Sequence, residues 1–274
     1  MLVLCREPDR LDDGKNNRRT GRSLFAEGLA PQPSVDMRAV LQLVALDVRV
    51  RQGGIGQHTA DHLNERLLNT LKAAYQLNTS RLQWLNVLDV QTSLERWVHV
   101  VRARKDSTPA LDLRKLEQCM IEVRRTVVLA GAAWNQAGPA FTRLTRLLPV
   151  QLEDAAPHFE PIEFAEMERL ARIGESTLSG GQTLSPFSKA RERYQKAAAE
   201  VAMAVVKVEQ TSNALRFAEN AFRVGARDAH EFASALIEHN QQRRELMQKS
   251  ARACVARYAL YALAQLLPEQ LGLR

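Results

Sequence analysis

The chain has 274 residues and a formal net charge of +7, with 45% hydrophobic residues but only 5% aromatic ones. This length allows one or two domains with a sizeable core, and the abundance of Ala and Leu favours helices over sheets. The basic residues form no block interleaved with aromatics, so we expect no nucleic-acid partner. No apolar run approaches the roughly 18 residues of a transmembrane helix, so we expect no membrane-spanning segment.

Residues 1–35 carry scattered charges, glycines and prolines without a sustained period, which is typical of a disordered arm. Ser34 or Asp36 can then cap a first helix, which ends before Gly53-Gly54-Ile55-Gly56. The glycine-rich stretch lacks the strand and the Lys-Ser/Thr pair of a phosphate loop, so it predicts a connector. One face of the helix is apolar and carries Met37, Val40, Leu41, Val44 and Val48.

Two helical patterns follow, and we expect a break between them at Asn78-Thr79-Ser80. The second pattern ends at Ser107-Thr108-Pro109, because helices usually end before a proline. His58 and His62 are four positions apart, but no third ligand completes a site, so we expect solvated histidines and no metal. The apolar positions are Leu63, Leu67, Ala74 and Leu77 in the first pattern, and Trp84, Val87, Leu94, Val98 and Val101 in the second.

A third apolar pattern at 3-4 spacing predicts a long helix from Leu113 to Leu148. It contains Gly138-Pro139, and because the spacing continues past the proline, a kink is favoured over a loop. Asp112 is a candidate N-cap for this helix. The pattern runs through Leu113, Leu116, Met120, Val123, Val127, Ala130, Trp134, Ala137, Phe141, Leu144 and Leu148.

The stretch from residue 150 to 187 is rich in Glu, Pro and Gly and predicts a linker with one short helix from Ile162 to Ile173. Glu163, Glu166 and Glu168 could form paired carboxylates, but a solvated acidic face explains them better. The sequence thus predicts a disordered arm (1–35), an N-terminal helical half (36–149), an acidic linker (150–187) and a C-terminal helical hairpin (188–274).

The C-terminal hairpin is the most specific prediction, with two long helices between Lys189 and Leu267 that reverse at Val224-Gly225-Ala226-Arg227. Gly225 can adopt a left-handed conformation at no steric cost, and Asp228 can cap the return helix. The polar stretch from Glu238 to Glu245 interrupts the apolar seam of the return helix. The seam of the incoming helix has 4-3 spacing, through Ala190, Tyr194, Ala197, Val201, Ala204, Val208, Thr211, Leu215, Ala218 and Phe222.

The segments AFRVGARDAHEFASAL (221–236) and ARYALYALAQLL (256–267) resemble the second hairpin of TolC-type outer-membrane efflux proteins. That family has two similar halves, each with an aromatic-x-Val-Gly turn at the periplasmic tip of a long hairpin. Phe222-Arg223-Val224-Gly225 matches this turn. In the first half Tyr75-Gln76-Leu77-Asn78 is the candidate for the second tip, with Asn78 in the place of Gly225.

The composition and the helical patterns together predict an all-α fold, in which long antiparallel helical hairpins with coiled-coil-like packing form an elongated bundle. The resemblance implies a transport component whose hairpins self-associate into a periplasmic duct that docks a periplasmic adaptor protein, at the periplasm or outer membrane. The residues that match the partner-binding tips are Val224, Gly225, Ala226 and Arg227, with Leu77 and Asn78 in the first half.

Some features depart from the family pattern. Pro161-Ile162-Glu163-Phe164 is too short for the membrane-spanning strands that the family places between its halves, and no signal peptide is seen. We therefore expect a shortened or divergent member, or a fragment of a gene product. The alternative is a soluble coiled-coil scaffold or adaptor protein without a transport role, which would be cytoplasmic.

The sequence contains no catalytic motif, such as a nucleophile elbow or a glycine-rich loop after a strand, so we expect neither an enzyme nor a cofactor. Cys5, Cys119 and Cys254 are too far apart in the chain to suggest a metal site, and we expect the last two to be small core residues. His230 and His239 are isolated, and we expect both at the surface.

Overall fold

The computed structural model describes residues 34–52, 57–103, 109–148, 151–153, 158–176, 186–225 and 228–273. These residues belong to one compact unit, Ser34–Arg274. Its long elements are α2 (Gln57–Ala103), α3 (Pro109–Thr145), α5 (Pro186–Arg223) and α6 (Ala229–Leu263). The shorter elements are β1 (Ser34–Asp36), α1 (Met37–Gln52), β2 (Gln151–Glu153), α4 (Phe164–Ser176) and α7 (Leu267–Gln270).

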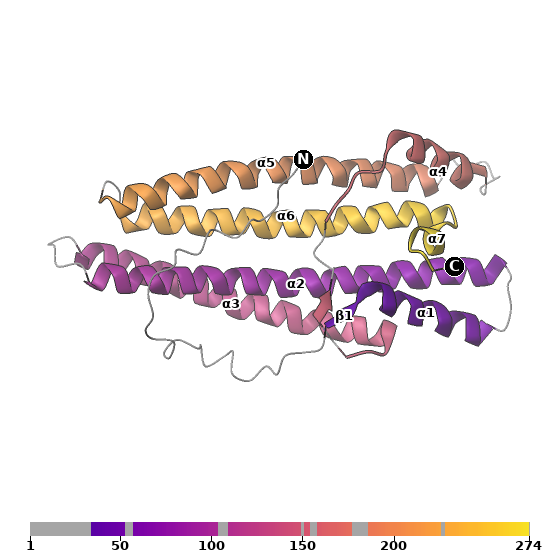
Figure 1. Ribbon diagram of the computed structural model, residues 1–274, viewed down its shortest axis with the longest axis horizontal. Helices are drawn as coiled ribbons and strands as arrows, with labels where there is room; N and C mark the ends of the chain where they lie inside the picture. The colour runs from indigo at the N-terminus through magenta and orange to yellow at the C-terminus, as the bar shows by residue number, and fades with distance from the viewer. Residues whose placement is uncertain are drawn as a thin grey trace, which may run out of the picture. The chain divides into compact units, whose positions relative to one another are not determined.

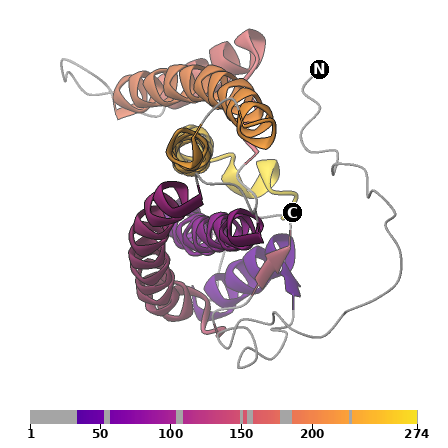
Figure 2. The same ribbon diagram turned by 90° about the vertical axis from the view of Figure 1, so that its left-hand side faces the viewer.

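The four long helices lie side by side in the order α5, α6, α2, α3 (Figures 1 and 2). Helices α2 and α3 form one antiparallel hairpin and α5 and α6 the other, and α6 packs on α2 to join them. The all-α fold with long antiparallel hairpins is therefore confirmed. Within the described residues, none of the helices combines the length and the apolar character that a membrane crossing requires.

The predicted helix break at Asn78-Thr79-Ser80 is wrong, because α2 continues through it without interruption. The Ser80 hydroxyl donates to the Gln76 carbonyl within the helix. Asn and Ser are only slightly less favourable than Ala inside a helix, by up to about 0.7 kcal/mol each. Leu77 and its neighbours Ala73 and Ala74 are buried in one cluster with residues of α1 and α3, and this burial outweighs the local preference.

Other predicted elements agree more closely with the structure. Helix α3 is continuous through Pro139, and the cysteines Cys119 and Cys254 are both buried. Helix α4 is displaced by two to three residues from its predicted bounds. The parallel pair of β1 and β2, in which Val35 lies opposite Leu152, has no counterpart in the sequence prediction.

Among the described residues, three apolar clusters make up the core. One lies between the hairpins at the end where α5 turns into α6, and contains Leu94, Leu116, Phe222 and Phe232. A second holds α1, α4 and α7 against the long helices at the other end and contains Leu67, Leu260 and Leu267. The third joins α1, α2 and α3. The first cluster packs the end of α2 and the first half of α3 against the residues on either side of the α5–α6 turn.

Candidate functional site

The turn between α5 and α6 has the predicted geometry. The Gly225 amide donates to the Phe222 carbonyl (3.1 Å), and Gly225 has a φ of 75°. Asp228 caps α6, since its side chain accepts a hydrogen bond from the Glu231 amide (2.9 Å). Val224 is 80% exposed at this tip. The tip residues Ala226 and Arg227 lie outside the described residues.

Three aromatic side chains pack together next to the turn. The rings of Phe222 and Phe232 stack at a centroid distance of 5.5 Å across the α5–α6 hairpin. Trp97 of α2 meets each of them edge-on, with both centroid distances at 5.2 Å. Edge-on and offset aromatic pairs of this kind add to the stability of a buried cluster. The last turn of α5 is therefore packed against α2 of the other hairpin.

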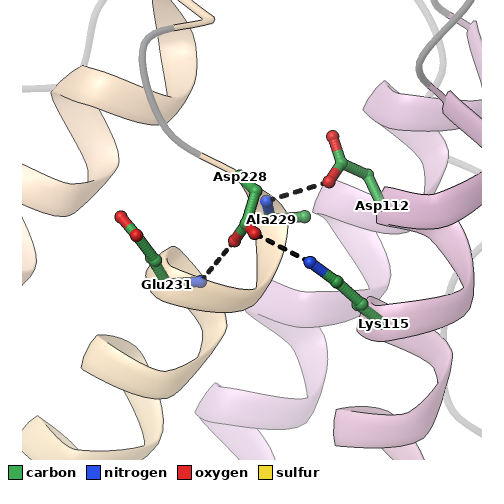
Figure 3. Close-up of polar contacts among 5 residues, drawn as sticks. All are labelled: Asp112, Lys115, Asp228, Ala229 and Glu231. Carbon is green, nitrogen blue, oxygen red and sulfur yellow. Dashed lines mark hydrogen bonds and ion pairs between the residues drawn. The ribbon is translucent and has the colours of Figure 1, made fainter.

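Polar contacts of α3 hold the start of α6 (Figure 3). The Lys115 ammonium group lies 2.8 Å from the second carboxylate oxygen of Asp228, and a carboxylate oxygen of Asp112 accepts from the Ala229 amide at 3.3 Å. The hydrogen bonds from Lys115 and from the Glu231 backbone lower the pKa of Asp228. Asp112 lies inside the first turn of α3, so its predicted role as the cap of that helix is wrong.

These contacts place the start of α3 beside the α5–α6 turn. The second tip predicted at Tyr75–Asn78 is wrong, because Leu77 and Asn78 lie in the middle of α2 and are only 2% and 4% exposed. The first hairpin turns instead between Ala103 and Pro109, across residues outside the described part. The Ser107-Thr108-Pro109 signal at the end of the second helical pattern marks this turn.

A groove of about 290 Å³ lies between α3 and α6 next to the tip. Its lining is mostly polar and comes from facing turns of the two helices, with Cys119 and Ile237 as its less polar members. His230 is exposed there, as predicted, whereas His239 is half-buried further along α6, with Nδ1 at 3.1 Å from the Thr211 hydroxyl oxygen. Burial lowers the pKa of His239. In the described residues, no three His, Cys, Asp or Glu side chains gather as metal ligands would.

The outer helices of the layer carry apolar side chains on their exposed faces. On α3, Ile121 and Val128 are seven positions apart, so they share a face, and both are more than half exposed. On α5, Met203 and Val206 are three positions apart and are also more than half exposed. The α6-facing side of α5 carries other residues, such as Val201 and Ala204. The two outer helices of the layer, α3 and α5, thus each expose apolar side chains.

The fold is similar to that of two solved membrane proteins. Similarity to the outer-membrane channel OprN gives a TM-score of 0.56 and 13% identity, and covers 83% of this chain and 72% of that one. A membrane protein from Pseudomonas aeruginosa gives a TM-score of 0.56 and 11% identity, with 83% and 71% covered. The likeness confirms the predicted resemblance at the level of the fold. No family model and no curated protein sequence matches the chain.

Proposed function

We propose that this chain is a transport component whose two helical hairpins assemble side by side with other copies into a duct at the periplasm or outer membrane. The observation that carries the proposal is the four-helix layer with apolar side chains on both of its outer helices, α3 and α5. Contiguous exposed apolar patches mark contacts with other molecules, and the spacing of these side chains places them on one face of each helix. The likeness of the fold to an outer-membrane channel supports the same role.

Assembly would bring the free face of α3 in one copy against the free face of α5 in the next. A contact between two different faces is heterologous, so repeated copies either close into a ring or extend into a filament. A ring of such layers encloses a central passage, which is what a duct requires. The two similar structures are membrane proteins, one of them a channel, which favours a non-catalytic role for this chain.

The α5–α6 tip is the proposed docking point for an adaptor protein. Val224 is exposed, Gly225 leaves open space where a side chain would stand, and a groove between α3 and α6 opens beside them. Arg227 completes the tip in the sequence. An Arg227→Glu change should reduce cross-linking to a periplasmic adaptor and leave the helical circular dichroism unchanged, because a tip charge is solvated until the partner arrives. Arg216→Glu, on the exposed side of α5, is the matched control.

The assembly is tested by light scattering after size exclusion of the purified chain. We expect the native chain to form an oligomer, and Val128→Glu or Val206→Glu to shift it toward the monomer, because a charge placed in an apolar contact loses its solvation. Phe164→Glu, at a 74% exposed position at the start of α4, should leave the oligomer intact. A native chain that stays monomeric at every concentration would contradict the duct and favour a scaffold without a transport role.

A further inference from the structure

A second groove, with a volume of about 630 Å³, lies in the middle of the layer among α2, α5 and α6. Its floor on α6 consists of small side chains, Ala251, Val255, Ala256 and Ala259, and Ala190 of α5 adds another. Small residues leave the space that larger side chains would fill. The volume falls within the range of about 300–1,000 Å³ that is typical of sites for small molecules.

The path of α3 explains why this groove is open. Near the tip, α3 lies against α6 and contacts it through Lys115. At its other end, Ala137 and Phe141 of α3 pack with α1 and α2 instead. Between these two regions only Ala133 of α3 lines the groove. The seam between α2 and α6 is therefore left uncovered over several turns.

The charges around the groove have one sign. Lys72, Arg193 and Arg252, one from each of the three helices, line it, and none of the lining residues is acidic. None of the three cations forms an ion pair within the described residues. An apolar floor with uncompensated cations is complementary to a ligand that has an alkyl chain and a negative head.

Thr79 is a buried polar residue at the wall of the groove. It lines the groove on the α2 side and is only 6% exposed, yet its hydroxyl oxygen has no hydrogen-bond partner within the described structure. Thr70 and Thr92 on the same helix donate instead to the carbonyls of Arg66 and Leu88, one turn earlier. A buried hydroxyl without a partner costs about 1–3 kcal/mol.

We propose that this groove binds a small anionic amphiphile with a single alkyl chain, taken up as a monomer. The apolar floor contacts the chain, and Lys72, Arg193 and Arg252 attract the negative head. The inference does not depend on the proposed assembly, because every lining residue comes from one copy of the chain.

Isothermal titration calorimetry of the full chain tests the proposal, with decyl sulfate below its micelle concentration as the probe. Three control compounds separate the contributions of the negative head and the alkyl chain. Decyltrimethylammonium has a positive head, decyl maltoside has an uncharged head, and sodium sulfate has no alkyl chain. We expect one site per chain, with decyl sulfate bound at least about tenfold more tightly than each of the other three. Equal binding of the cationic and anionic decyl compounds, or of sulfate alone and decyl sulfate, would overturn the proposal.

Variants locate the site. The double change Arg193→Gln with Arg252→Gln should weaken decyl sulfate binding about fivefold to tenfold, since two partly solvated charges are removed. The matched control is Arg125→Gln with Arg216→Gln, which removes the same charge from exposed positions that do not line the groove. The assignment would be contradicted if the first pair left decyl sulfate binding unchanged, or if both pairs weakened it equally. Loss of the helical circular dichroism in the Arg193→Gln, Arg252→Gln variant would also contradict it, because the weaker binding would then come from unfolding.

Discussion

The two hairpins meet in two different ways along their length. Near the tip, the contact is made by the aromatic rings of Trp97, Phe222 and Phe232 and by the ion pair of Lys115 with Asp228. In the middle it is made by the polar stretch of α6, where Gln83 and Asn86 of α2 donate to the carbonyls of Arg244 and Asn240. The side-chain amide oxygen of Asn86 and the Arg244 Nε are buried there and have no hydrogen-bond partner within the described structure.

This difference indicates how stability is distributed along the bundle. Apolar burial and aromatic pairs stabilise the tip, whereas buried polar atoms without partners make the middle costly. The stretch from Glu238 to Glu245 interrupts the apolar seam in the sequence. In the structure, this stretch makes polar contacts with α2. Changes at the tip should cost much more folding free energy than changes in the middle.

The largest effect is expected for Phe222→Ala. Phe222 is fully buried and its ring contacts both Trp97 and Phe232. Truncation of a buried Phe to Ala typically costs about 3–5 kcal/mol, because apolar burial is lost and a cavity remains. Chemical denaturation followed by circular dichroism measures the loss. Phe217→Ala, at an exposed position on the same helix, is the control, and an equal loss in both variants would contradict the role of the tip cluster.

The next effect is expected at the turn. Gly225→Val should destabilise by about 1–2 kcal/mol, since a β-branched residue is strained at a φ of 75°. A Cβ at this position would meet no atom within 4 Å, so the cost comes from the backbone conformation and not from a clash. Gly225→Asn, which tolerates the left-handed conformation, should cost clearly less. Equal unfolding free energies for the two variants would argue against this explanation.

A smaller effect is expected at the start of α6. Asp228→Ala removes the N-cap and should cost about 1 kcal/mol, whereas Asp228→Asn keeps a capping side chain and loses only the charge. The folded-state pKa of Asp228 is lowered, so its charge stabilises the fold fully above the unfolded pKa of about 3.9. This stability is lost as the pH falls through the folded-state value. Urea unfolding between pH 7 and pH 3 should show a smaller decline for Asp228→Asn than for the native chain.

The smallest effect is expected in the middle. Asn86→Leu removes one weak hydrogen bond and also a buried oxygen that has no partner, so the free energy of unfolding should change by less than about 1 kcal/mol. The reverse exchange at the tip, Leu94→Asn, buries an amide in an apolar cluster and should cost several times more. Similar losses in both variants, measured by urea unfolding, would show that the two regions do not differ as described.

The sequence predicts those features of the tip that depend only on neighbouring residues. The turn at Gly225 and the cap at Asp228 depend on a few neighbouring residues, and both are confirmed. Asn78 carries a similar local signal, but it is buried inside a continuous helix because of tertiary packing.

The remaining contacts join distant segments and have no local signal. The partner of Asp228, Lys115, lies 113 residues earlier in the chain. The strands β1 and β2 have three residues each, which is too short for an alternating pattern to be recognised. No periodicity indicates that α3 would leave α6 and uncover a groove.

Side-by-side assembly is tested most directly by photo-cross-linking between copies. A benzophenone amino acid at Val206 of α5 should link to α3 of another copy, near Ile121 and Val128. Mixing chains labelled with nitrogen-14 and nitrogen-15 identifies the peptides that come from different copies by mass spectrometry. The account predicts mixed-isotope peptides that join α5 to α3. Cross-links found only within one chain, or between copies only at α1 and α4, would contradict it.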